Sequence, residues 1–124
     1  RISIEITAQN ALRESAKFTQ FCDMCEALGV KIVIDNFDQQ ECDLQAIFSL
    51  PIAGIKVSAT LFDKVNTNPA TENYIKELIS SATNKHITVI AERIEQQQTL
   101  EVVKQLGVKY AQGFYFRHPM PDVE

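Results

Sequence analysis

Short apolar runs alternate along the chain with longer segments whose apolar residues have helical spacing. Each apolar run is four to nine residues long, which is typical of a buried strand. The strands predicted in this way cover residues 2–6, 31–35, 54–57, 87–92 and 108–116. Strands that alternate with helices in units of about 30 residues form parallel sheets. The pattern therefore predicts an α/β fold with about five mostly parallel strands and covering helices.

The helical segments carry residues that favour helix ends. Residues 10–28 have apolar side chains three and four positions apart, and Gly29 follows as a residue that closes helices in the left-handed conformation. Asp43 is placed to cap a short helix through residue 48, and Asn68 with Pro69 forms the cap and first turn of another. No composition shift or low-complexity stretch divides the chain. We therefore expect one domain.

Polar side chains end the five predicted strands. In chain order they are Glu5, Asp35, Lys56, Glu92 and Gln112. Alternate side chains of a strand share one face of the sheet, and the carboxyl ends of parallel strands meet at one rim. The residues two positions earlier, on the same face, are Ser3, Val33, Gly54, Ile90 and Tyr110. We therefore expect the five polar groups to converge, although a solvated strand end is the simpler explanation for any one of them.

Carboxylates gathered at one rim favour hard divalent cations. Mg²⁺ and Mn²⁺ prefer carboxylate and water oxygens as ligands. Two such ions can clamp the attacking and leaving oxygens of a phosphodiester while a lysine steadies the attacking water. The constellation therefore predicts phosphodiester hydrolysis as its most specific chemistry.

Composition and charge narrow the classes of partner and compartment. The chain is 45% hydrophobic and 23% charged with a net charge of −4, and a chain with no basic stripe is not expected to bind a nucleic acid polymer. No apolar run is long enough to span a bilayer, so we expect no membrane contact by this segment. Three cysteines cannot all pair within the chain, which favours the reducing cytoplasm. Cys22 and Cys25 have a zinc-like spacing, but both lie on an apolar helical stripe, which favours core packing.

Five short motifs include the polar groups at the strand ends. They are Glu5-Ile6-Thr7, Asp35-Asn36-Phe37, Ile55-Lys56-Val57-Ser58, Ala91-Glu92-Arg93-Ile94-Glu95 and Gln112-Gly113-Phe114, with Pro119 after them. In order and spacing these motifs resemble those of the EAL domain of bacterial cyclic di-GMP phosphodiesterases. The resemblance covers essentially the whole chain. It implies a partial TIM-type (β/α) barrel and hydrolysis of cyclic di-GMP with Mg²⁺ or Mn²⁺, with Ca²⁺ as a metal that supports binding without turnover.

The resemblance also implies roles for the rim residues. The metal ligands would be Glu5, Asp35, Asn36 and Glu92, and the catalytic groups would be Glu92 as general base, Lys56 holding the water and Gln112 orienting it. Just beyond the fifth strand, Arg117 is placed to contact a nucleotide phosphate or base, and Phe114 is placed to stack on guanine.

Several positions depart from the family pattern. Asn36 stands where a second aspartate is usual, Arg93 where a glycine is usual, and Ser58 where an aspartate follows the lysine. The segment after Phe37 contains no glycine, although the family loop is glycine-rich. Lost carboxylates and loop glycines favour binding over efficient catalysis, since catalysis needs ligands held within about 0.5 Å.

Residues 1–124 are expected to form the C-terminal portion of a single EAL-like domain, with the N-terminal half of the barrel absent from this segment. Five strands cannot close an eight-stranded barrel, so we expect the open edges to be covered by a second copy of the chain or by other residues of the same polypeptide. A sensory domain is expected upstream. The favoured function is a degenerate cyclic di-GMP receptor or regulatory domain. An active phosphodiesterase and a protein-interaction scaffold that no longer binds nucleotide remain as alternatives.

Overall fold

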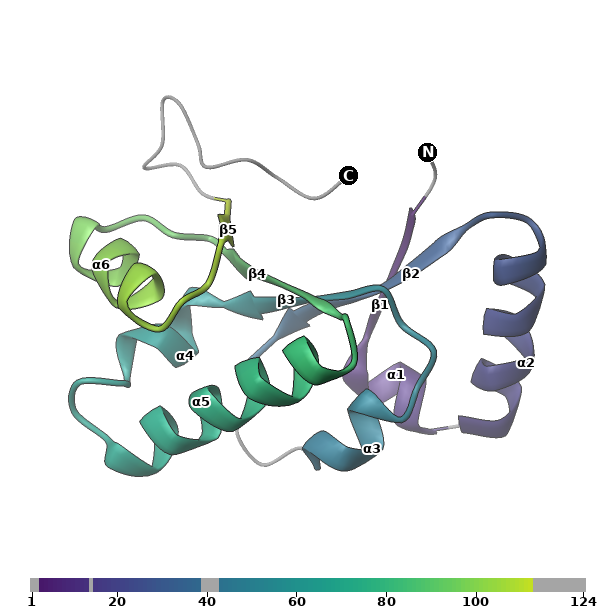
Figure 1. Cartoon of the computed structure of the whole chain (residues 1–124), viewed down its shortest axis with the longest axis horizontal. Coiled ribbons are helices and arrows are strands. Elements are labelled where there is room, and N and C mark those ends of the chain that lie inside the picture. The colour runs from purple at the N-terminus through teal and green to yellow at the C-terminus, as the bar shows by residue number, and fades with distance from the viewer. Residues whose placement is uncertain (1–2, 14, 39–42, 113–124) are drawn as a thin grey trace.

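A five-stranded parallel sheet forms the centre of the molecule (Figure 1). The structure, a computed structural model, describes residues 3–13, 15–38 and 43–112. The strands are adjacent in chain order: β1 (Ser3–Thr7), β2 (Lys31–Phe37), β3 (Gly54–Ser58), β4 (Thr88–Glu92) and β5 (Tyr110–Ala111). This confirms the predicted α/β fold and the parallel order.

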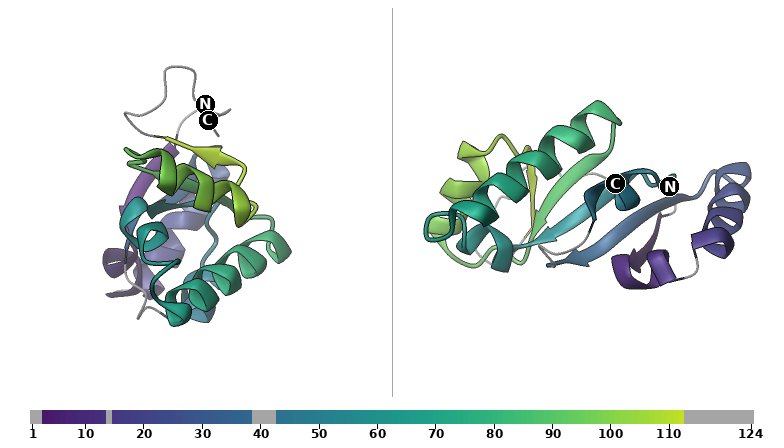
Figure 2. Two further views of the ribbon diagram at one scale, coloured as in Figure 1. Left: turned by 90° about the vertical axis from the view of Figure 1, so that its left-hand side faces the viewer. Right: turned by 90° about the horizontal axis from the view of Figure 1, so that it is seen from below.

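Helices connect each strand to the next. They are α1 (Ala8–Arg13), α2 (Ser15–Ala27), α3 (Leu44–Phe48), α4 (Ala59–Asp63), α5 (Pro69–Asn84) and α6 (Gln97–Gln105). In Figure 1, α1, α3, α4 and α5 lie below the sheet, α2 stands at one end and α6 at the other, and Figure 2 shows the same arrangement from the side and from below. The parallel strands with helices along one face are arranged as in a segment of a TIM-type barrel.

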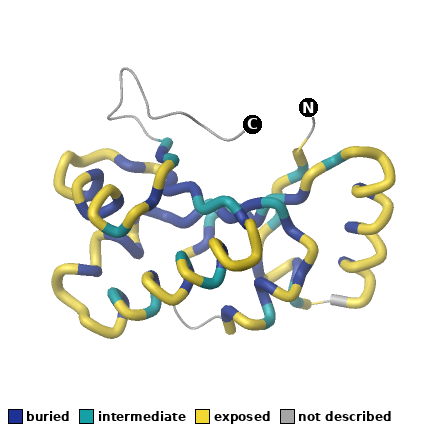
Figure 3. Tube along the Cα trace, viewed as in Figure 1, coloured by how far each residue is buried: buried dark blue, intermediate teal, exposed yellow. Residues whose placement is uncertain are grey.

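The core lies between the sheet and this helical layer. Ile34, Ile55 and Ala91 are fully buried, and each directly precedes a predicted rim residue, so each lies on the opposite face of the sheet. Ile75 and Leu78 of α5 are also fully buried, on the side of α5 that packs against the sheet layer. The buried residues concentrate along the sheet and the inner sides of the helices in Figure 3.

The segment predicted as one helix over residues 10–28 is two helices, so that prediction was wrong. The first, α1, begins at Ala8 and buries Ala8 and Ala11, whereas α2 buries Phe18, Cys22 and Cys25. The two helices run in different directions at the β1 end of the molecule, so a single stripe cannot serve both (Figure 1). Two residues assigned to that stripe, Phe21 and Leu28, are 37% and 75% exposed.

The fifth strand is shorter than predicted. The predicted strand covered residues 108–116, whereas β5 is Tyr110–Ala111, and the part of the prediction from residue 113 onward lies outside the described residues. Backbone pairing continues one residue further, because the Gln112 N–H donates to the Ala91 carbonyl at 2.8 Å. No helix in the described part of the chain has the length and apolar character needed to cross a membrane.

Candidate functional site

The predicted rim residues lie at or near the carboxyl ends of neighbouring strands, although Glu5 and Lys56 are each the middle residue of a five-residue strand. Glu5 lies on β1, Asp35 on β2, Lys56 on β3 and Glu92 at the end of β4, and Gln112 follows β5. The register places Thr7 opposite Asp35 and Ser58 opposite Glu92. Because all strands are parallel, these ends share one edge of the sheet.

Glu5 and Lys56 share the sheet face turned away from the helices. A hollow of about 120 Å³ on this face is lined by Ser3, Glu5, Lys31, Val33, Ala53, Gly54, Lys56, Thr88 and Ile90. It includes four of the five residues placed two positions before the polar groups, which supports the alternation inferred from the sequence. The face that would be the interior of a barrel therefore carries both a carboxylate and an ammonium group.

Lys56 forms an ion pair with Glu5 across the intervening strand β2. The distance from Lys56 Nζ to Glu5 Oε2 is 2.9 Å, and the side chains are 16% and 44% exposed. The ammonium group thus neutralises a carboxylate that the family resemblance assigns to a metal. The role of Lys56 in holding a water molecule stays a prediction.

Glu92 is the most buried charged group of the rim. The residue is 8% exposed, and its Oε2 atom is buried with no hydrogen-bond partner among the described residues. Burial raises the pKa of this carboxyl above its ordinary value, and the nearby Asp35 carboxylate raises it further. Arg93, Lys56 and a hydrogen bond from the Asn36 backbone N–H oppose the rise.

The Asp35 and Glu92 carboxyl groups make the part of the rim best suited to a cation. A cation beside them would satisfy the unpartnered Oε2 atom and relieve the repulsion that the pKa of Glu92 reflects. Within residues 3–13, 15–38 and 43–112, however, no group of three or more histidine, cysteine or acidic side chains is close enough to hold a metal ion. The residues therefore fit a partial metal site that needs further ligands.

The remaining site predictions have different outcomes. Gln112 is half-buried, and its contacts with neighbouring strands come from its backbone. Phe114 and Arg117 lie outside the described residues, so their proposed nucleotide contacts stay predictions. Asn36 has a positive φ of 51°, a feature that the sequence pattern did not indicate.

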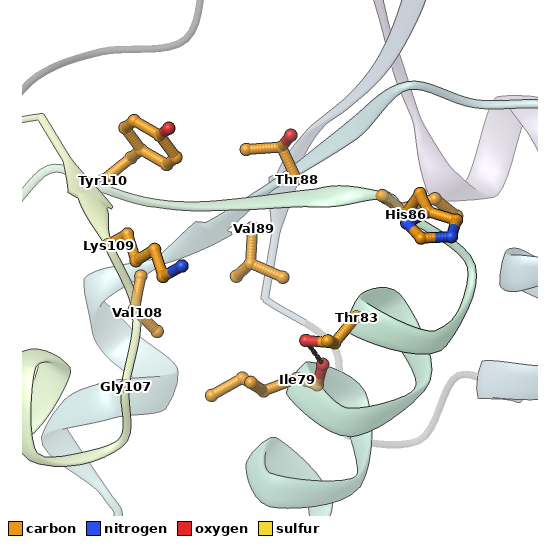
Figure 4. A pocket seen from close by; sticks show the side chains of 10 residues that line it. Ile79, Thr83, His86, Thr88, Val89, Gly107, Val108, Lys109 and Tyr110 are labelled. Atoms are coloured by element: carbon orange, nitrogen blue, oxygen red, sulfur yellow. Dashed lines mark hydrogen bonds between the residues drawn. The ribbon is translucent and has the colours of Figure 1, made fainter.

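Two further hollows flank the sheet. One, of about 230 Å³, lies beside the rim and is lined by Thr7, Ala8, Gln9, Asn36, Phe37 and Asp38. The other, of about 350 Å³, lies near the amino ends of β4 and β5, and its residues come from α5, β4 and the segment entering β5 (Figure 4). No acidic residue lines the second hollow. Neither hollow can be predicted from the sequence, because each is formed by residues from segments that only the packing brings together.

The fold and the rim define a class of protein, the TIM-barrel-like α/β domains with acidic residues at the ends of their strands. Residues 1–119 match the EAL domain family. The chain belongs to this family, which confirms the resemblance inferred from the five motifs.

Proteins similar to this chain include enzymes of cyclic di-GMP turnover. The cyclic di-GMP phosphodiesterase PdeA of Borreliella burgdorferi is 27% identical over 120 residues, which cover 97% of this chain and 18% of that protein. The oxygen sensor protein DosP of Escherichia coli is 23% identical over 124 residues, which cover 100% of this chain and 16% of that protein. The chain spans less than a third of the length of these curated relatives.

Solved structures of other proteins share the fold. The EAL enzyme Bd1971, bound to cAMP and cyclic di-GMP, is 28% identical with a TM-score of 0.79, and the match covers 96% of this chain and 31% of that one. Klebsiella pneumoniae BlrP1, in a calcium and cyclic di-GMP complex, is 23% identical with a TM-score of 0.83 and coverages of 95% and 30%. At that lower identity the likeness shows the fold alone, which is TIM-barrel-like.

Proposed function

We propose that this chain is part of a cyclic di-GMP signalling module, a degenerate EAL domain that acts as a nucleotide receptor or regulatory domain. The observation that carries the proposal is the state of the rim. Glu92 and Asp35 retain an acidic pair with an unpartnered oxygen, whereas Asn36 has no charge and Glu5 is neutralised by Lys56. An incomplete acidic rim favours binding over turnover, because catalysis requires a fuller and more exact set of ligands.

Divalent cation binding is part of this proposal. Asp35 and Glu92 would hold Mg²⁺, Mn²⁺ or Ca²⁺, with Asn36 and Glu5 as further oxygen donors. A bound cation supplies positive charge that offsets the charge of the phosphodiester. The cyclic di-GMP bound form of Bd1971, which is 28% identical, supports the choice of nucleotide, and the choice of ion class follows from the carboxylate oxygens. Further ligands would come from the remainder of the domain, of which residues 1–124 would be the C-terminal portion.

The chain's own residues would act directly on the nucleotide. Lys56, 16% exposed beside the hollow of the inner face, would place its ammonium group near a phosphate oxygen once it is released from Glu5. Glu92, whose pKa is raised by burial and by Asp35, would accept a proton more readily than an exposed glutamate does. Both roles keep an active phosphodiesterase as the alternative function, since the residues for positioning and for proton transfer are present.

Binding and turnover can be separated by the choice of metal. We expect calorimetry of the full-length protein to detect binding of cyclic di-GMP with Ca²⁺, and chromatography to detect no linear dinucleotide after incubation with Mn²⁺. Accumulation of the linear product with Mn²⁺ would instead establish the phosphodiesterase. If neither binding heat nor linear product is detected, the receptor proposal is wrong and the interaction scaffold is the remaining alternative.

Two matched variants test whether nucleotide binding with Ca²⁺ depends on the rim. Asp35→Asn should weaken binding with Ca²⁺, because it removes one of the two charges that face each other there. Glu101→Gln, which removes one carboxylate from the exposed side of α6, should leave binding unchanged. Equal loss in both variants would mean that overall charge, and not the rim, controls binding. A cytoplasmic location, where a cyclic dinucleotide second messenger would be met, belongs to the same proposal.

A further inference from the structure

Strand β2 contains one extra residue at the rim, and the chain has a second extra residue where β4 ends. On β2, Ile34 pairs with Ile55 and Phe37 pairs with Val57, so two residues of β2 lie opposite one residue of β3. These two residues are Asp35 and Asn36. The mismatch is the signature of a β-bulge, in which the bulged strand bends and a side chain is turned in a new direction.

The bulge on β4 is visible in its hydrogen bonds to β5. The Gln112 N–H donates to the Ala91 carbonyl at 2.8 Å, and the Gln112 carbonyl accepts from the Ile94 N–H at 3.0 Å. Regular parallel pairing would use the N–H of residue 93, two positions after Ala91, and not that of Ile94. Glu92 and Arg93 therefore stand where one residue would suffice.

A left-handed backbone accompanies each bulge. Asn36 has a φ of 51° and Arg93 a φ of 62°, and each directly follows the acidic residue of its bulge. Non-glycine residues adopt this region rarely, and β-branched residues are strongly disfavoured there. His86, with a φ of 59°, is the other non-glycine residue with positive φ in the described ranges, and it lies in the turn before β4 at the opposite end of that strand.

The two bulges flank the same central strand. Because β2 and β4 are the two neighbours of β3, the bulges lie on either side of Lys56 and Ser58. The Asn36 backbone N–H donates to the Glu92 carboxylate, and Asp35 is close enough to repel it. Two acidic side chains from strands that do not pair with each other thus lie close enough for one carboxylate to raise the pKa of the other.

We propose that Asn36 and Arg93 are positioning residues whose left-handed backbone holds the two bulges that aim Asp35 and Glu92 at one shared point of the rim. For Arg93 this role belongs to the backbone and does not require the guanidinium group. The inference rests on the proposed function, because it explains how that function's acidic pair is assembled. It predicts that residue 93 tolerates glycine and rejects a β-branched side chain.

The test compares glycine with valine at position 93 in the full-length protein. Arg93→Gly and Arg93→Val both remove the charge, but only glycine adopts a positive φ without strain. Hydrogen exchange of the Ile94 amide in metal-free buffer reports the bulge, and Mn²⁺ titration followed by electron paramagnetic resonance reports the acidic pair. His86→Gly and His86→Val form the matched control, since they change the same backbone requirement away from the rim.

We expect Arg93→Val to bind Mn²⁺ about 10- to 100-fold more weakly than Arg93→Gly, the range typical of lost support for metal ligands. The Ile94 amide should stay protected in Arg93→Gly and exchange faster in Arg93→Val. The His86 pair should differ in melting temperature but agree in both other readouts. Equal Mn²⁺ affinity and equal Ile94 protection in the two Arg93 variants would overturn the inference. If the parent protein binds no Mn²⁺, the proposed metal site fails, and the Ile94 exchange still decides whether residue 93 holds the bulge.

Discussion

At the scale of single residues, the rim is governed by how each charge is compensated. Lys56 and Glu5 neutralise each other at 2.9 Å, whereas Glu92 is 8% exposed and has an oxygen without a partner. A buried carboxylate whose charge is only partly compensated lowers the free energy of unfolding, while a partly exposed ion pair contributes little. Glu92 is therefore the rim residue at which stability and function are most strongly opposed.

The raised pKa of Glu92 predicts that replacing this residue increases the free energy of unfolding by an amount that depends on pH. A folded-state pKa above the ordinary 4.5 means that the folded state favours the protonated form of Glu92. The stabilisation that comes from this protonation is complete below pH 4.5 and is lost as the pH rises through the folded-state pKa. Glu92→Gln removes the penalty, and in metal-free buffer it should raise the free energy of unfolding at pH 8 by on the order of 1 kcal/mol. Thermal melts from pH 4 to pH 8 should show the gain shrinking toward acid, with Glu101→Gln as an exposed control. A gain of the same size at pH 4 would contradict the assignment.

At the scale of elements, apolar spacing and capping residues were sufficient to predict a helix that has one buried face. In α5 the buried residues Thr71, Ile75, Leu78 and Ala82 follow helical spacing, and the predicted cap at Asn68 is present. The region of α1 and α2 was not resolved by the same reasoning, because two short helices with different buried faces share one run of apolar residues. Spacing alone cannot show which of two apolar stripes meets the sheet.

The cap of α5 offers a direct test at this scale. The Asn68 Oδ1 atom accepts from the N–H groups of Ala70 at 3.0 Å and Thr71 at 3.4 Å. Asn68→Ala should lower the free energy of unfolding by about 1 kcal/mol, because these donors lose their partner at the helix start. Asn68→Asp, which retains a capping oxygen, should recover most of the loss in chemical denaturation. An alanine variant as stable as the parent would show that α5 is held by packing alone.

At the scale of the whole molecule, the sheet is open. β1 and β5 are each paired on one side within the described residues, and the inner face has a hollow beside Glu5 and Lys56. Unpaired strand edges are templates for association with another chain. That the chain is the C-terminal portion of one EAL domain stays a prediction, and it agrees with an open sheet whose edges call for further strands.

Self-association of the isolated 124-residue chain follows from these edges. Light scattering after size exclusion should give a mass above 14.0 kDa that rises with concentration. Two exposed apolar residues, Met24 of α2 and Leu28 directly after that helix, offer a competing contact, at 62% and 75% exposed. Met24→Lys combined with Leu28→Lys should leave the association in place, because it does not alter the edges. A double variant that is monomeric at all concentrations would assign the contact to α2 instead.

The sequence by itself determined the parallel α/β class, the faces of the strands and the family. These properties follow from the alternation of side chains along a strand and from motif spacing, and both are local. Only the tertiary structure decided that Lys56 pairs with Glu5, that Glu92 is buried beside Asp35, and that β2 and β4 bulge at Asn36 and Arg93. Each of these depends on how residues distant in the chain are aligned across strands, where one extra residue redirects a side chain without leaving a signal in the hydrophobic pattern.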